Sequence, residues 1–416
     1  MEITTPVKNH DREIFMDSLR GFAILGIFIA NLAGFSHFEE DDKIISPWII
    51  EGWDGVMSFL HHWFIEGKFY SIFSLLFGWG IALQIKRGME NGAVVLPVVI
   101  RRLWFLLLLG TIHLLVWTGD IVAFYALLGF LLLLFRKFSN KTLLVIGSAL
   151  ILSPIMLYWL KMNFSFLNLP AGIFYEIGNK LSHTLLGIDS DASYRNIMLK
   201  GSWFDHLTIN FCGIFYRYGY LFFVSRIPKV LGMFLIGYVV GRTEFYKNLT
   251  QHKKLVYWII GLGLLIGLPA NFMLAQFIST SEDDYFNLKM NGLYQTIFYA
   301  LGVAPLALAY VGMLMLSFQT TVGHKLLQLI APVGKMAFSN YLMHSLIGNF
   351  VFLGAGLGYM GKVGPVYYTL FGIAVFIFQI IFSTTWLKYF QYGPVEWLWR
   401  SLTYKKKQPF RILSNN

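Results

Sequence analysis

Two residues in the first third of the chain have the spacing of a general acid–base pair. His113 lies in the apolar stretch LLLLGTIHLLVW, and Asp120 follows in a tight turn before YALLG. A carboxylate beside an imidazole orients the ring and raises its basicity, which proton transfer from a substrate requires. The same pattern also arises when the histidine bonds a neighbouring carbonyl and the aspartate caps the next helix. The pair predicts a catalytic site and leaves the structural role open.

The first apolar segment carries three further polar residues, Asp17, Arg20 and Asn31. Asp17 and Arg20 are three positions apart, so on a helix they share a face and either pair as an anchor or line a site. Asn31 follows Arg20 by eleven positions and returns to nearly the same face. Its amide would either bond a neighbouring helix or hold an oxyanion. Polar groups within a membrane helix need partners, so all three are candidate site residues.

Polar residues also occur in two later segments. Lys68 and Ser74 lie in GKFYSIFS, where they either reach the interface and bond their own helix or line a site. Asn340 and His344 are four positions apart in GKMAFSNYLMHSLIGNF and therefore share a helix face. That face is expected to look into the bundle, toward a substrate or toward neighbouring helices.

The chain offers little for a metal or a disulfide. Its single cysteine, Cys212, excludes an internal disulfide and a cysteine metal cluster. His61 and His62 are adjacent and project differently, so they make a poor metal pair, although either would serve as a general base. We predict no metal site and no permanently bound cofactor.

The composition is typical of a membrane protein. Of the 416 residues, 56% are hydrophobic and 13% are charged, whereas soluble proteins have about 25% charged residues. Apolar segments near the ~20 residues that cross a bilayer recur along the chain. We predict an all-α, polytopic bundle of about ten transmembrane helices. The predicted helices are 18–37, 66–85, 99–117, 121–136, 141–160, 222–241, 255–278, 291–318, 331–353 and 365–388.

The distribution of basic residues predicts the orientation. Most Lys and Arg lie in the termini and in four connections, at residues 86–102, 136–141, 242–254 and 319–330. Both termini are therefore expected in the cytoplasm. The net charge of +11 then serves orientation and contact with anionic lipid, and no nucleic-acid partner is predicted.

The chain is expected to form a single membrane domain, 1–404, followed by a basic cytoplasmic tail, 405–416. Two longer segments are expected on the outer side. Residues 38–65 would form an interfacial helix, and residues 161–221 would form a lid of short helices.

Five blocks of the sequence together resemble the YeiB-like bacterial membrane proteins, the domain-of-unknown-function family 418. The blocks are DSLRGFAILGIFIANLAGF, GKFYSIFSLLFGWG, LLLGTIHLLVWTGDIVAFYALLG, GKMAFSNYLMHSLI and GPVEWLWRSLTY. They run from residue 12 to residue 404, nearly the whole chain. The resemblance implies a multi-pass protein of the bacterial cytoplasmic membrane.

More distantly, the chain is similar to two groups of membrane acyltransferases, the acyltransferase-3 proteins and the heparan glucosaminide N-acetyltransferases. Both pass an acyl group from cytoplasmic acyl-CoA to an acceptor across the membrane. The first group has an Arg followed, after ten residues, by a catalytic His; Arg20 and Asn31 keep that spacing with Asn in place of His. The second group has Asn there and a His in the next outer segment. By this analogy the base is one of His37, His61, His62 and His113.

The leading prediction is accordingly a membrane acyltransferase. Acyl-CoA would enter from the cytoplasm, with its phosphates near Arg20, Arg101 and Arg102. His113 would deprotonate a small-molecule, glycan or lipid acceptor, and Asn31 would hold the oxyanion. The expected partners are the lipid bilayer, the acceptor and, in a homo-oligomer, another copy of the chain. The rival predictions are a small-solute transporter with a polar intramembrane path and a membrane scaffold without a substrate.

Overall fold

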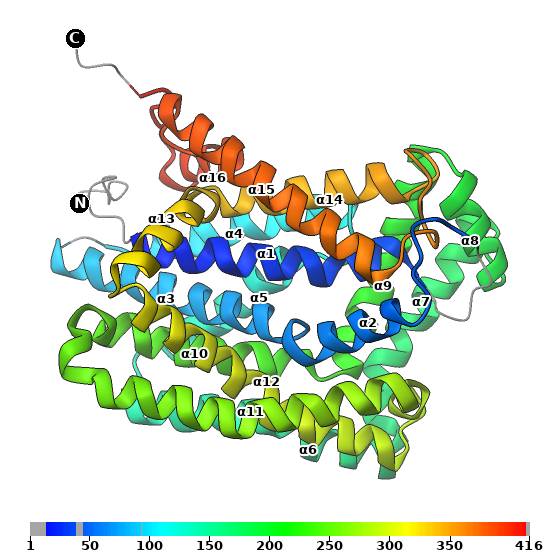
Figure 1. The fold of residues 1–416 in the computed structure, drawn as a ribbon, viewed down its shortest axis with the longest axis horizontal. Helices are drawn as coiled ribbons and strands as arrows, with labels where there is room; N and C mark the ends of the chain where they lie inside the picture. Colours follow the sequence, from blue (N-terminus) through cyan, green and yellow to red (C-terminus); the bar gives the residue numbers. More distant parts are fainter. Residues whose placement is uncertain (1–13, 39–44, 93, 413–416) are drawn as a thin grey trace.

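The computed structural model describes residues 14–38, 45–92 and 94–412, and these residues form a bundle of helices without a strand (Figure 1). The predicted all-α class is confirmed. The predicted membrane segments correspond to long helices, with one exception described below. These helices are α1 (Ile14–Ser36), α3 (Lys68–Glu90), α4 (Leu96–Leu114), α5 (Val122–Leu134), α6 (Asn140–Asn163), α10 (Arg226–Thr243), α11 (Leu249–Phe286), α12 (Met290–Ser317), α13 (Thr321–Lys335), α14 (Ala337–Phe352) and α15 (Pro365–Tyr389).

The remaining helices lie mostly at the ends of the bundle. Helices α7 to α9 gather at the end opposite the start of α1, whereas α16 lies at the same end as the start of α1 (Figure 1). These elements are α2 (Trp53–Phe64), η2 (Ser165–Asn168), α7 (Leu169–Leu186), α8 (Asp191–Lys200), α9 (Trp203–Phe223), η3 (Phe245–Asn248) and α16 (Pro394–Tyr404).

The length and composition of the helices indicate a membrane protein. Among the described residues, seven helices are long and apolar enough to cross a bilayer, with α2 and α3 counted as one, and the bent pair α9–α10 makes up to eight. Helix α5 has 13 residues and α14 has 16, fewer than the ~20 that a full crossing requires.

The single helix predicted over 331–353 is wrong, because the chain breaks at Met336 between α13 and α14. Glu396 of α16 accepts hydrogen bonds from the backbone N–H groups of Phe338 (2.7 Å) and Ser339 (3.0 Å). These are first-turn N–H groups of α14, which have no partner within their own helix. A carboxylate from a distant segment therefore stabilises the start of α14, where the local sequence has no capping residue.

Helices α1 and α13 cross at two glycines. A Cβ atom on Gly334 would collide with the carbonyl oxygen of Asp17, and one on Gly21 would collide with the carbonyl of Ile330. The two backbones are in direct contact there, as is common where membrane helices pack closely. This crossing fixes the end of α1 that carries Asp17 and Arg20 against the start of α14.

Helices α9 and α10 are bent by 73° at a short break. Ser225 lies in the break with φ of 51°. The ammonium group of Lys161 donates to the carbonyl oxygens of Phe222 (2.9 Å) and Phe223 (2.7 Å). A cation on the last carbonyls of a helix stabilises its C-terminus. Helix α9 therefore ends here, and the chain changes direction into α10.

Candidate functional site

A serine, a histidine and an aspartate form a hydrogen-bonded chain inside the bundle. Nδ1 of His113 lies 2.7 Å from Oδ1 of Asp120, and Nε2 of the same ring lies 2.8 Å from Oγ of Ser345. All three residues are buried. In this arrangement the carboxylate orients the imidazole, and the imidazole can take a proton from a hydroxyl group at Nε2.

Three helices position this triad. Asp120 uses its second oxygen to accept the backbone N–H of Ala123 at 2.8 Å, so it also caps the start of α5. A Cβ on Gly110 would collide with Ala123, so the close packing of α4 on α5 depends on that glycine. Helix α14 supplies Ser345 and is joined to the α4–α5 turn by Asn349, whose amide donates to the carbonyl of Val116 at 2.6 Å.

A cavity of about 630 Å³ opens at the end of the bundle where α1 begins. Basic residues from α1, α3, α4, α13 and α16 line it, together with two acidic residues and an apolar inner wall. The basic residues are Arg20, Arg87, Arg102, Lys335 and Arg400; the acidic ones are Asp17 and Glu396. The apolar wall includes Phe73, Leu76, Phe77, Val99, Leu103 and Leu106. The cavity therefore suits a ligand with an anionic head and an apolar tail.

The inner end of the cavity reaches the residues that surround the triad. Tyr341 and Ile121 line the cavity. The ring centroid of Tyr341 is 5.3 Å from that of His113, and its hydroxyl accepts the backbone N–H of Ile121 at 3.2 Å. His113, Asp120 and Ser345 themselves do not line it. One tyrosine ring thus separates the cavity from the imidazole.

Of the three arginines predicted to bind phosphate, two line the cavity and one does not. Arg20 lines the cavity and pairs with Asp17 at 2.8 Å. Arg102 lines it too, donates to Gln84 at 2.9 Å and lies 4.3 Å from the ring centroid of Trp399. Arg101 instead donates to the carbonyl of Thr403 at 3.0 Å and does not line the cavity.

The other predicted binding residues lie around the cavity or elsewhere. Ser74 is 2.6 Å from the hydroxyl of Tyr125, which lines the cavity. Lys68 is buried outside it and donates to the carbonyl of His62 at 2.6 Å. Asn340 donates to Ser383 at 3.0 Å, whereas Nε2 of His344 lies 3.1 Å from the Gln379 side chain. Both of these partners belong to α15, so this face of α14 contacts a neighbouring helix.

Asn31 lies on the face of α1 that is directed at α14 and at the α4–α5 turn. Phe28, one turn before it, stacks on His344 at 4.0 Å, and Phe35, one turn after it, stacks on Trp117 at 3.7 Å. Positions three and four apart share a helix face. Asn31 is half-buried and makes no side-chain hydrogen bond to a described residue. It therefore has an amide available on the side of α1 that faces the helix bearing Ser345.

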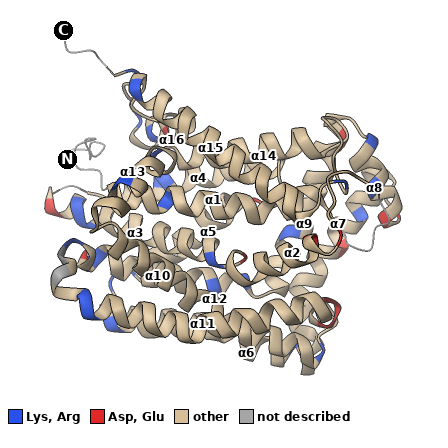
Figure 2. Ribbon diagram, viewed as in Figure 1, with Lys and Arg blue, Asp and Glu red and all other residues tan. Residues whose placement is uncertain are grey.

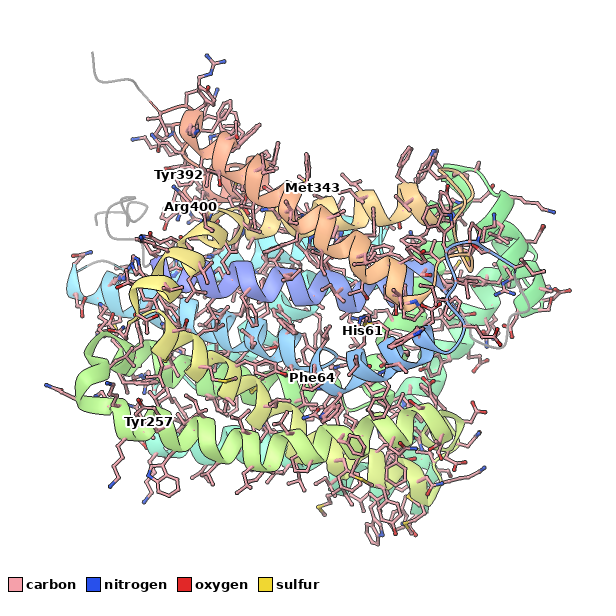
Figure 3. All side chains as sticks on the ribbon, viewed as in Figure 1. His61, Phe64, Tyr257, Met343, Tyr392 and Arg400 are labelled. Atoms are coloured by element: carbon pink, nitrogen blue, oxygen red, sulfur yellow. The ribbon has the colours of Figure 1, made fainter. Side chains whose placement is uncertain are left out.

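The alternative histidines lie apart from this site. Nε2 of His61 is 2.8 Å from the hydroxyl of Thr369 on α15. Figure 3 shows His61 in the half of the molecule away from Arg400. His62 bonds Glu66, and the His37 ring lies 6.4 Å from that of Tyr194. Of the four, His113 is the one whose ring contacts both Asp120 and Ser345 among the described residues. No group of three metal-ligating residues occurs in the described ranges.

Sequence reasoning missed Ser345, Tyr341 and Glu396 as site residues. Ser345 directly follows His344 in the polar stretch of α14, and it lies four positions after Tyr341, on the face directed at His113. The signal that would have found both was the (i, i+4) spacing on the second polar face of this helix.

Comparison with known proteins identifies relatives over the full length. A family model described as "Protein of unknown function (DUF418)" matches residues 240–406. The chain is 33% identical over 419 residues to "Uncharacterized protein YxaH" of Bacillus subtilis (strain 168), covering 98% of each chain. It is 29% identical over 421 residues to "Uncharacterized protein YeiB" of Escherichia coli (strain K12), covering 96% of this chain and 98% of that one. No solved structure matches.

Proposed function

This chain belongs to the DUF418 family of YeiB-like proteins, and we propose that it is a membrane acyltransferase that uses acyl-CoA as the donor. The observation that carries the proposal is the cavity that begins at basic residues and ends one tyrosine ring from His113. A thioester donor with a phosphorylated head has the matching distribution of charge and apolar surface.

The residues along α4 support a position for the donor. Arg102 lies in the cavity, and His113 follows eleven positions later on the same helix, ~16 Å away at 1.5 Å per residue. Phosphate groups are expected at Arg102, Arg20 and the other cavity cations, because guanidinium groups bind phosphate through paired, charge-assisted hydrogen bonds. The thioester would then point at Tyr341, and a small rotation of that ring would admit it.

Transfer needs a base and an oxyanion partner. Nε2 of His113 takes the proton of the attacking hydroxyl or amine, while Asp120 stabilises the imidazolium. The attacking atom forms a bond to the thioester carbonyl carbon, the carbon–sulfur bond breaks, and the CoA thiolate leaves with the proton from Nε2. Asn31 donates its amide to the carbonyl oxygen during attack.

Ser345 occupies the position on Nε2 that the attacking group must take. Two routes are compatible with this geometry: the acceptor displaces Ser345, or Ser345 takes the acyl group first and passes it on. A Ser345 ester that accumulates without acceptor, detected by peptide mass and removed by hydroxylamine, distinguishes the second route from the first.

The proposed arrangement in the membrane has ten embedded segments, in which α5 and α14 are short and α13 adjoins α14. It places both termini in the cytoplasm of a bacterium. Lys and Arg gather at the end of the bundle where α1 begins and α3 ends (Figure 2), which supports that orientation. A cysteine at Ser190, on the α7–α9 end, should then react with an impermeant reagent in intact cells. Protection of that cysteine together with an externally accessible C-terminus would reverse the orientation.

The function is tested with purified protein in detergent. We expect CoA to bind and an acyl group to move from acyl-CoA to a component of a mixed acceptor pool. Ser345→Ala should retain CoA binding; it should abolish transfer on the acyl-serine route. Absence of CoA binding, together with movement of a solute into liposomes that depends on His113, would favour the transporter instead.

A further inference from the structure

Five basic residues gather around the break between α9 and α10, and we call them the basic cluster. The basic cluster consists of Lys68, Lys161, Arg217, Arg226 and Lys229. Lys68 and Lys229 are buried at 0% and 8% exposure. Within the described part of the chain, none of the five forms an ion pair with a carboxylate. Figure 2 shows Lys and Arg well inside the outline of the bundle as well as at its ends.

Arg226 and Lys229 lie against two tyrosines. Arg226 donates to the hydroxyl of Tyr299 at 3.1 Å, and its guanidinium carbon lies 4.5 Å from the ring centroid of Tyr70. The Lys229 ammonium lies 4.1 Å from the ring centroid of Tyr299 and has no hydrogen bond to a described residue. The hydroxyls of Tyr70 and Tyr299 bond each other. Two cations and two phenols therefore converge at the start of α10.

The other three cations contact carbonyl groups, a hydroxyl group and aromatic rings. Lys161 and Lys68 use their ammonium groups on backbone carbonyls, as described above. Nη2 of Arg217 lies 3.4 Å from the carbonyl oxygen of Gly119, and its Nε has no hydrogen-bond partner among the described residues. Carbonyl dipoles hold part of this charge but do not neutralise it.

The nearby carboxylates do not balance the basic cluster. Glu66 lies within electrostatic range of Lys68 and Arg226, but its carboxylate bonds His62. Asp120 lies within range of Arg217, but it bonds His113. Lys229 also experiences the charges of Arg226 and Lys161. Unpaired cations inside a membrane protein are costly and mark sites where a partner binds. Two carboxylates stand near five cations, and a bound anion would balance the remaining charge.

We infer that the basic cluster binds a phosphoryl group, held by Arg226, Lys229 and the tyrosine hydroxyls. A phosphate carries up to about two negative charges and several acceptor oxygens. An arginine fork and a lysine point charge meet that demand together. The inference that this phosphoryl group belongs to the acyl acceptor rests on the proposed function.

The position of the basic cluster fits an acceptor. Lys68 begins α3, whereas Arg87 of the cavity lies nineteen positions later, ~28 Å along the helix. The basic mouth of the donor cavity, at Arg87, and the basic cluster are therefore at opposite ends of α3. Arg217 contacts Gly119, the residue before Asp120. An acceptor anchored at the basic cluster would approach His113 from the side away from the donor.

The test uses two pairs of probes on purified full-length protein. Glycerol 3-phosphate with glycerol as its neutral control represents a soluble phosphate, and short-chain phosphatidic acid with diacylglycerol represents a lipid headgroup. We expect a phosphorylated probe of at least one pair to bind and its neutral control not to bind. Arg226→Gln and Lys229→Gln should each weaken that binding roughly tenfold or more. Lys180→Gln, which removes an exposed cation of α7 paired with Glu176, is the matched control and should change nothing.

Folding and CoA binding are measured on the same preparations. Arg226→Lys keeps the charge and should retain most of the binding, and the melting temperature of ligand-free Arg226→Gln should not fall. The glutamine variants should bind CoA as the wild type does, because neither Arg226 nor Lys229 lines the cavity. If the protein binds CoA and the phosphorylated probe but transfers no acyl group, the phosphoryl site stands and its role in binding the acceptor is refuted. Equal binding of phosphorylated and neutral probes, or glutamine variants that bind like wild type, would overturn the site itself.

Discussion

Oγ of Ser345 lies 2.8 Å from Nε2 of His113, although 232 positions separate the two residues. The contact forms because α14 packs closely on α1, where a Cβ on Gly348 would collide with the ring of Phe35. The same helix is tied to the α4–α5 turn by Asn349. The hydroxyl therefore completes a proton-transfer chain that begins at Asp120.

Replacement of His113 by Gln should reduce acyl transfer by about 10²–10⁴-fold, because Gln keeps hydrogen bonding but does not exchange a proton near neutral pH. CoA affinity should not change, since His113 does not line the cavity. Transfer rates and CoA binding isotherms of the folded variant check both statements. A variant that transfers at the wild-type rate would exclude His113 as the base.

Replacement of Asp120 by Asn should also reduce transfer, because the neutral amide no longer favours the imidazolium. Folding should be retained, since Asn also serves as a helix cap and can accept the N–H of Ala123. The measurement pairs transfer rates with melting temperatures. Full activity would show that the carboxylate only caps α5.

Arg102→Gln should weaken CoA binding by about tenfold or more, because a charge-assisted phosphate contact is lost. Its neighbour provides the matched control: Arg101→Gln removes the same charge from α4, but from a side chain that does not line the cavity and bonds the Thr403 carbonyl. Equilibrium binding of CoA to both variants is the check. Equal weakening by the two substitutions would indicate a general charge effect and not a phosphate contact at Arg102.

Gly334→Ala should destabilise the protein by about 1–3 kcal/mol, because the added methyl group forces α13 away from α1. Gly261→Ala is the control, since a Cβ there meets nothing within 4 Å. That variant should be neutral or more stable by up to about 1 kcal/mol, because Ala favours a helix more than Gly does. Melting temperatures in one detergent compare the pair; equal shifts would contradict the direct α1–α13 backbone contact.

Glu244, in the connection after α10, is expected to make a contribution to stability that is lost in acid. Burial would raise the pKa of this carboxyl, but hydrogen bonds from Lys247 (2.8 Å) and Lys86 (2.6 Å) outweigh it and lower the pKa below its usual 4.5. The folded state therefore gains stability above pH 4.5 and loses it as the pH falls through the lowered pKa.

The pH dependence is checked with Glu244→Gln. The melting temperature of the wild type should decrease more on acidification through this range than that of the variant. Glu176→Gln, at an exposed pair with Lys180, is the control and should follow the wild type. Parallel curves for wild type and Glu244→Gln would show that the bridge contributes no stability.

The sequence predicted most of the long helices because each of them contains a long apolar run. It did not predict the break at Met336, since the stabilising carboxylate, Glu396, comes from sixty positions further on. His113 and Asp120 were predictable as a pair because only a turn separates them. Ser345 was not, because helix packing alone brings it to the imidazole.

The basic cluster was hidden for the same reason. Its members are one cation each in α3, α6 and α9 and two in α10, and each one alone suggests an anchor at the membrane interface. Their common location follows from the 73° bend between α9 and α10, which brings the end of α9 to the start of α10 and exposes carbonyls that Lys161 then binds.

Tyr341 closes the inner end of the cavity, which matters for a cell that stores energy as an ion gradient across its membrane. The cavity stops at this ring, whose hydroxyl is fixed on the backbone of Ile121. Behind the ring lie the buried side chains of His113 and Asp120. In the proposed orientation, this ring would separate the cytoplasmic cavity from His113, and a bound acyl group that moves the ring would link the two. An acyl group would thus cross the bilayer without a parallel leak of protons.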